Sequence, residues 1–214
     1  MTPAYVIVFI FLCAYVSAVS SQLQIQENGK ISVRIGTTSG CSDAARFMAQ
    51  IRSTYDRFKD FVNYEFVPWG RTRRDENGDL VCQFRAPDCW ANRVHRCALH
   101  MLEGNADAQM NYMECEFSPP YPAFRQRSIL CAHAAGLSVV EMDICIRTRV
   151  GDDLEGPAEE LSREPIAVIN FVPFIVFNNS TNRALHLQGY RRLESVICFA
   201  LADNETTGIT HCRI

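Results

Sequence analysis

Residues 31–70 read ISVRIGTTSGCSDAARFMAQIRSTYDRFKDFVNYEFVPWG, and this stretch decides the fold. The first five residues alternate between apolar and polar side chains, which is typical of a strand. From Ala44 to Phe58 the apolar residues recur every three or four positions, which predicts an amphipathic helix of about four turns. Residues 62–67 alternate again and predict a second strand. A strand, a helix and a strand in this order predict a βαβ unit and therefore a parallel sheet.

Cys41 lies between the first strand and the helix, in the segment Gly40-Cys41-Ser42-Asp43-Ala44. Unpaired backbone N–H groups and the helix dipole stabilise a thiolate at a helix start, so we expect a lowered pKa and a reactive thiol. Asp43 opposes this effect, because a nearby carboxylate disfavours a second negative charge. An inert or disulfide-bonded Cys41 is the alternative. A redox enzyme carries Cys-x-x-Cys at such a place, and here Ala44 stands at the second cysteine position.

The chain has ten cysteines, and nine of them lie beyond residue 20. An odd number leaves at least one thiol without a partner in the same molecule, either bonded to another chain or free and reactive. Nine cysteines in an exported chain predict an oxidising compartment and a disulfide framework. No Cys-x-x-Cys pair is present, so structural disulfides are favoured over a metal site. Eight paired cysteines allow about 105 connectivities, and their spacing does not choose among them.

Residues 1–20 predict a signal peptide. Their apolar run, which begins at Ala4, is shorter than the roughly 20 residues that a membrane span needs, and small residues follow it. A retained membrane anchor is the alternative. We expect the mature chain, residues 21–214, to be one domain with no membrane partner. The net charge of −3 and the pI near 6.0 argue against nucleic acid as a partner.

Three sequons agree with export through the secretory pathway. Asn178, Asn179 and Asn204 are all candidate N-glycan acceptors. Because Asn178 and Asn179 are adjacent, we expect one usable site between them, in a hairpin loop. The sequence therefore predicts a secretory-pathway glycoprotein.

Residues 71–164 carry most of the cysteines and predict a helical, disulfide-rich insertion. Its basic residues Arg71, Arg73 and Arg74 are typical of a solvated loop. Helical segments are expected at 82–102, at 124–145 with an interruption near Gly136, and within 151–164 before Pro165.

After the insertion the pattern returns to strands. Residues 168–177 are strongly β-prone, and residues 184–188 alternate like a partner strand. A last amphipathic helix is expected around residues 193–201. The order βαβ, helical insertion, ββα resembles the thioredoxin layout, so we expect an α/β, thioredoxin-like fold with a helical insertion.

Pro173 falls inside the expected strand 168–177. A proline removes a donor from a strand ladder, so its presence needs a reason. A cis Val172–Pro173 bond beside Cys41 would supply one. Thioredoxin-like proteins place such a proline against the active-site cysteine, and the backbone of the preceding residue, here Val172, is left to pair with substrate. A trans proline at a sheet edge is the alternative.

The segment 82–97 resembles the signature of the gamma-interferon-inducible lysosomal thiol reductase (GILT) family, Cys-Gln-His-Gly-x-x-Glu-Cys-x-x-Asn-x-x-Glu-x-Cys. The matching residues are Cys82, Gln83, Cys89, Asn92 and Cys97. The departures are Phe84, Arg85 and His95, with Asp88 as a conservative replacement of Glu. The segments 67–70 and 171–174 are similar to the family's Val-Pro-x-Gly and Tyr-Val-Pro-Trp, so the resemblance runs from about Ile31 to Cys212.

The resemblance implies reduction of protein disulfides in endosomes and lysosomes, or outside the cell if the protein is secreted. It implies that Cys41 is the nucleophile and that the resolving cysteine is missing at Ala44. Turnover would then need a small thiol such as glutathione or cysteine, with no bound cofactor or metal. The partners would be polypeptides that contain disulfides. The structural disulfide cysteines would be Cys82, Cys89, Cys97, Cys115, Cys131, Cys145, Cys198 and Cys212.

Two alternatives to this single-cysteine oxidoreductase remain. One is a catalytically lapsed relative that binds polypeptides or captures thiols covalently, and the departures at Ala44, Phe84 and Arg85 favour it. The other is a disulfide-linked dimer through Cys41. We expect His95 and His100 to be surface or hinge residues rather than ligands.

Overall fold

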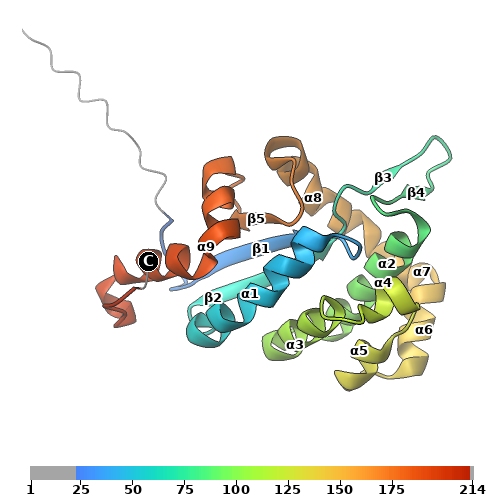
Figure 1. The fold of residues 1–214 in the computed structure, drawn as a ribbon, viewed down its shortest axis with the longest axis horizontal. Coiled ribbons are helices and arrows are strands. Elements are labelled where there is room, and N and C mark those ends of the chain that lie inside the picture. Colours follow the sequence, from blue (N-terminus) through green and yellow to red (C-terminus); the bar gives the residue numbers. More distant parts are fainter. Residues whose placement is uncertain (1–22, 213–214) are drawn as a thin grey trace, which may run out of the picture.

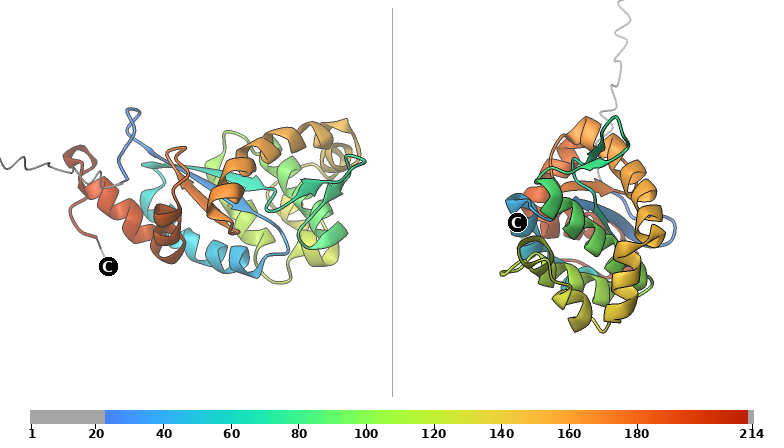
Figure 2. Two further views of the ribbon diagram at one scale, coloured as in Figure 1. Left: turned by 90° about the horizontal axis from the view of Figure 1, so that it is seen from above. Right: turned by 90° about the vertical axis from the view of Figure 1, so that its right-hand side faces the viewer.

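The computed structural model describes residues 23–212, so the expected signal peptide lies outside the described residues. Its main sheet has three strands in the order β2-β1-β5 (Figure 1). The insertion helices gather at one end of the molecule and α9 extends toward the other (Figure 2). No helix within residues 23–212 is long and apolar enough to cross a membrane.

The predicted βαβ unit is confirmed. β1 (Ile31–Thr37) leads into α1 (Ser42–Phe58), and β2 (Val62–Pro68) returns parallel to β1. The register pairs Ile31 with Val62 and Thr37 with Pro68. The helix forms here because its apolar side chains lie on one face and are buried against β1.

β5 (Phe174–Phe177) pairs antiparallel with β1 and has buried side chains on both faces. Ile175 and Phe177 belong to the core that α1 and α9 (Arg183–Ala202) cover. Phe174 and Val176 belong to a second core under α8 (Glu155–Ile169). The sheet is therefore a buried layer between helices, which is the architecture expected of an α/β fold.

Two expectations for the closing segment are wrong. Residues 168 and 169 belong to α8, which also contains Pro165, so the expected strand 168–177 is reduced to β5. Residues 184–188 form the first turns of α9 rather than a fourth strand. Asn182 explains this outcome, because its side chain accepts a hydrogen bond from the N–H of Leu185 and caps the helix. A five-residue alternation is too short to outweigh that cap.

The insertion consists of a short hairpin followed by helices. The hairpin pairs β3 (Arg73–Arg74) with β4 (Leu80–Val81). The segment expected as one interrupted helix at 124–145 is three helices, because the chain turns after Gln126 and again at Gly136, where φ is +82°. The insertion helices before α8 are α2 (Arg85–Met101), α3 (Ala106–Glu116), α4 (Pro122–Gln126), α5 (Leu130–Ala134), α6 (Val139–Arg147) and α7 (Arg149–Asp153). A 3₁₀ turn, η1 (Glu205–Thr207), follows α9.

Four disulfides join the eight cysteines that the family resemblance assigns to bridges. Three of them lie in the insertion and one closes the C-terminal segment. The pairs are Cys82–Cys89, Cys97–Cys145, Cys115–Cys131 and Cys198–Cys212. Because each bridge restricts the unfolded chain, we expect each to contribute on the order of 2–4 kcal/mol to stability.

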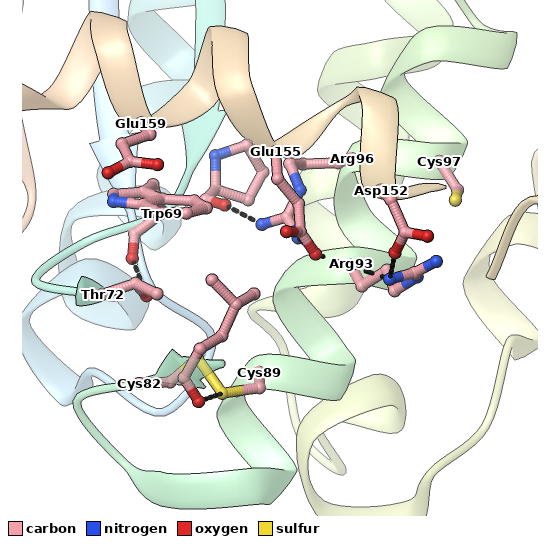
Figure 3. Close-up of polar contacts among 12 residues, drawn as sticks. Trp69, Thr72, Cys82, Cys89, Arg93, Arg96, Cys97, Asp152, Glu155 and Glu159 are labelled. Atoms are coloured by element: carbon pink, nitrogen blue, oxygen red, sulfur yellow. Dashed lines mark hydrogen bonds and ion pairs between the residues drawn. A yellow bond between two sulfur atoms is a disulfide. The ribbon is translucent and has the colours of Figure 1, made fainter. Parts of the chain in front are cut away.

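A charged cluster fastens the insertion to the sheet (Figure 3). Arg96 donates a hydrogen bond of 2.8 Å to the carbonyl of Pro68 at the end of β2, and its guanidinium lies over the ring of Trp69. Burial lowers the pKa of Arg96 to about 10, and the carboxylate of Glu155 opposes that shift. Glu155 also pairs with Arg74 at 3.1 Å. Arg71, Arg73 and Arg74 are exposed, as expected of a solvated segment, but Arg73 and Arg74 form β3 rather than a loop.

Gly36 gives a test of how tightly the sheet is packed. A Cβ at Gly36 would overlap the ring of Phe174 on β5. We expect Gly36→Ala to lower the free energy of unfolding by roughly 1–3 kcal/mol. A Cβ at Gly156 meets no atom within 4 Å, so Gly156→Ala is the matched control and should leave stability unchanged or raise it by up to about 1 kcal/mol. Equal urea denaturation midpoints for the two variants would contradict the close approach.

Candidate functional site

The structure brings together the three residues that the sequence placed in one site. Cys41 is the N-cap of α1, and Val172 and Pro173 lie in the loop before β5. The Val172–Pro173 peptide bond is cis. The thiol of Cys41 donates to the carbonyl of Val172, with 3.4 Å between sulfur and oxygen. The predicted substrate-pairing backbone is thus occupied by the thiol itself.

Cys41 is the free cysteine among residues 23–212, because every other cysteine there is in a disulfide. Its residue surface is only 7% exposed. The described residues contain no cluster of three or more side chains that could hold a metal ion. The chemistry that this arrangement offers is that of a single thiol.

The expectation of a lowered thiol pKa is wrong, because burial raises the pKa of Cys41. The backbone N–H groups of Ala44 and Asp43 lower it, as the helix-start argument requires. The charges of Asp43 and Asp88 raise it further. The loss of hydration that burial imposes on the thiolate raises the pKa more than the backbone N–H groups at the helix start lower it.

Ala44 occupies the position where a second redox cysteine would stand, and it is fully buried. It lies in the first turn of α1, in the core that also contains Cys41. A methyl group can neither attack a mixed disulfide nor form a bridge with Cys41. The site therefore has the thiol of Cys41 without a second cysteine at the position where a redox pair would place one.

One face of α2 holds the loop that carries Cys41. Asp88 is fully buried and accepts hydrogen bonds from the hydroxyl of Thr38 at 2.7 Å and from the N–H of Gly40 at 3.0 Å. Asn92, one turn later, accepts from the N–H of Ser39 at 2.9 Å. These two residues belong to the cysteine-rich signature, and their role is to position the loop.

His95 continues the same face, and the expectation that it is a surface or hinge residue is wrong. Its side chain is 1% exposed, with Nδ1 3.4 Å from the hydroxyl of Ser39 and Nε2 3.4 Å from a carboxylate oxygen of Glu116. The spacing of Asp88, Asn92 and His95 by four and three residues is the signal that could have revealed this face. His100 is exposed, as expected.

Two aromatic rings cover Gly40, the residue before Cys41. A Cβ at Gly40 would lie 2.6 Å from the ring of Phe84 and 2.8 Å from the ring of Phe124. The two rings meet edge to face, with centroids 6.4 Å apart. Phe84 is 37% exposed and stands where the family signature has His. Arg85 follows it with φ +66°, a conformation that explains why the signature has Gly there.

A second aromatic pair flanks the site from the C-terminal side. The rings of Phe171 and Tyr190 have centroids 5.0 Å apart. The hydroxyl of Tyr190 lies 3.4 Å from a carboxylate oxygen of Asp43, and Phe171 directly precedes Val172. Sequence reasoning missed Phe124 and Tyr190, because nothing in the local pattern relates α4 or α9 to Cys41.

The adjacent sequon residues differ in their contacts. The side chain of Asn178 accepts from the N–H of Ser32 and donates to the carbonyl of Gln24, so it joins β1 to the N-terminal segment. Asn179 is exposed and accepts from Arg34. These residues lie in a turn between β5 and α9, not in the expected hairpin loop. Asn204 accepts from the N–H and the hydroxyl of Thr206 in its own sequon.

A family model described as gamma interferon inducible lysosomal thiol reductase (GILT) matches residues 32–135. The chain is 23% identical over 185 residues to GILT-like protein 1 of Drosophila melanogaster, covering 79% of this chain and 74% of that protein. It is 28% identical over 98 residues to a gamma-interferon-inducible lysosomal thiol reductase-like protein of Anopheles gambiae, covering 40% and 41%. Among solved structures it resembles a thioredoxin-like oxidoreductase from Silicibacter pomeroyi, with TM-score 0.53, 12% identity and coverage of 79% and 88%. The last similarity confirms the predicted thioredoxin-like fold.

The raised thiol pKa predicts how Cys41 reacts with iodoacetamide. Only the thiolate is alkylated, and a raised pKa keeps the thiolate fraction small at neutral pH. We expect the alkylation rate to rise about tenfold per pH unit from pH 6 to pH 8. The rate is measured by intact mass. A rate that levels off within this range would show that the pKa of Cys41 is lowered, which would contradict the conclusion that burial has the larger effect on it.

The contacts of Asp88 predict a large loss of stability when its carboxylate is removed. Asp88→Ala leaves the donors of Thr38 and Gly40 without their acceptor, so we expect unfolding free energy to fall by roughly 2–4 kcal/mol. Asp60 is exposed, and Asp60→Ala should stay within about 0.5 kcal/mol of the wild type. Similar denaturant midpoints for both variants would show that Asp88 does not hold the loop.

Proposed function

The chain belongs to the GILT family, and on that premise we propose that it exchanges the disulfides of polypeptide substrates through the single thiol of Cys41. The observation that carries the proposal is the unpaired thiol at the start of α1, in contact with the loop of the cis proline. The thioredoxin-like fold and the family supply the kind of chemistry, that of thiol oxidoreductases. The single-cysteine mechanism is our inference from Ala44.

The reaction begins when Cys41 loses its proton and attacks one sulfur of a substrate disulfide. A bond forms between Cys41 and that sulfur, the substrate's S–S bond breaks, and the released sulfur takes up a proton. A substrate strand that pairs with the carbonyl of Val172 replaces the thiol that occupies it in the free protein.

Release needs an external thiol because Ala44 cannot attack the mixed disulfide. One molecule of glutathione or cysteine attacks the sulfur of Cys41, frees the reduced substrate and remains bonded to Cys41. A second removes this cap and leaves as the disulfide of the small thiol. Each substrate disulfide thus consumes two small thiols, and no bound cofactor takes part.

A second candidate is slow covalent capture of polypeptide cysteines, and the raised pKa of Cys41 favours it. At pH 5 a thiol with an ordinary pKa near 8.5 is about 0.03% ionised, and a raised pKa reduces that fraction further. Capture without efficient release would hold partners as long-lived mixed disulfides. A disulfide-linked dimer through Cys41 is the third candidate.

We place this activity in the secretory pathway, with the endosome, the lysosome or the extracellular space as its site. The four disulfides and the absence of a membrane-spanning helix within residues 23–212 fit such a route. Asn179 and Asn204 are the better glycan acceptors, because the amide of Asn178 is engaged on both sides.

Disulfide reduction at pH 5 tests the proposal. Wild type should turn over only with excess glutathione, and Cys41→Ala should have no activity above the uncatalysed rate. Ala44→Cys places a thiol one helical turn from Cys41, so it should form a bridge with Cys41 and turn over at lower glutathione concentrations. Ala44→Ser is the matched control, because it adds a similar group that cannot resolve a mixed disulfide.

One result would contradict the oxidoreductase proposal, and a further measurement would then test the second candidate. Absence of any glutathione-dependent turnover that Cys41→Ala removes would contradict the oxidoreductase proposal. Intact mass analysis of the same samples would then show whether Cys41 holds captured polypeptides, as the second candidate requires.

A further inference from the structure

Two phenyl rings lie next to Cys41 on the insertion side. Phe84 and Phe124 cover Gly40 and support each other edge to face. Phe124 is partly buried, whereas Phe84 remains 37% exposed. Because the ring of Phe124 packs against it, the exposed ring of Phe84 presents an apolar surface to a substrate that approaches Cys41.

A substrate bonded to Cys41 cannot avoid this surface. Consecutive Cα atoms are about 3.8 Å apart, so the residues next to the reacting cysteine stay within roughly 10 Å of the Cys41 sulfur. Phe84 contacts the residue that precedes Cys41, so its ring lies within reach of those neighbours. Phe171 and Tyr190 form a second aromatic pair beside Val172 and Asp43.

The identity of residue 84 determines what can be recognised there. An apolar side chain that packs on the ring of Phe84 leaves water at no polar cost, whereas a polar one loses hydration without finding a partner. Histidine, the residue of the family signature, would offer hydrogen-bonding nitrogens at the same place. The exchange of His for Phe therefore replaces a polar contact by an apolar one beside the nucleophile.

We infer that Cys41 selects polypeptide cysteines whose sequence neighbours are apolar or aromatic, and that Phe84 is the residue that determines this preference. The inference rests on the proposed function, because it describes the substrate of the same thiol. It requires no further reactant. Cys41 loses a proton and bonds to one sulfur of the substrate disulfide, the S–S bond of the substrate breaks, and the displaced sulfur takes up the proton.

The test uses two short peptides of equal charge, each with one cysteine capped by glutathione. In one peptide Phe and Leu flank the cysteine, and in the other Ser and Asn flank it. The rate at which each peptide is transferred to Cys41 is followed by intact mass at pH 8. We expect wild type to react roughly tenfold faster with the apolar peptide, as partial burial of one apolar side chain would give.

The ratio of the two rates is the readout, because a general change in folding or in thiol reactivity affects both peptides alike. We expect Phe84→Ser and Phe84→His to reduce the ratio to about twofold or less. Phe199 is 47% exposed on α9, and Phe199→Ser is the matched control that should keep the wild-type ratio. If one Phe84 variant fails to fold, the other still gives the ratio.

Three outcomes would each contradict either the inferred preference, the role of Phe84 or the proposed function. Equal rates for both peptides in wild type would contradict the preference itself. An unchanged ratio in both Phe84 variants would show that Phe84 does not determine it. If Cys41 of wild type reacts with neither peptide nor with glutathione disulfide, the proposed function fails rather than the preference.

Discussion

The buried carboxylate of Asp88 is the constraint on which the site depends. It joins α2 of the insertion to the loop after β1 through the hydroxyl of Thr38 and the N–H of Gly40. Asn92 adds a parallel contact to Ser39. Because an unpaired buried carboxylate is costly, these hydrogen bonds hold the loop in one arrangement. The position of Cys41 thus follows from a residue 47 positions later in the chain.

In this arrangement two effects on the pKa of Cys41 oppose each other. The helix start brings backbone N–H groups to Cys41, which favours the thiolate. The insertion and the loop before β5 bury it, which disfavours the thiolate more strongly. In the free protein the thiol donates a hydrogen bond to the carbonyl of Val172, and the substrate strand that we propose would take its place.

The parts of the fold that could be predicted are those with local signals. β1, α1 and β2 follow from hydrophobic periodicity, and a free cysteine follows from the odd count. The prediction of a partner strand at 184–188 was wrong because the cap at Asn182 and packing against β5 make that segment helical. The prediction for His95 was wrong because its burial depends on α3, which supplies Tyr112 and Glu116, and on Phe117 directly after that helix.

The sequence by itself determined the βαβ unit, the place of Cys41 at a helix start, the absence of a second thiol at Ala44 and the family resemblance. These depend on residues that are close in the chain or on residue identity alone. Only the tertiary structure decided which cysteines pair, that the thiol is buried and its pKa raised, and that Phe84 and Phe124 cover the preceding Gly40. The reason is physical: desolvation and packing depend on every atom near the sulfur, and those atoms come from segments far apart in the sequence.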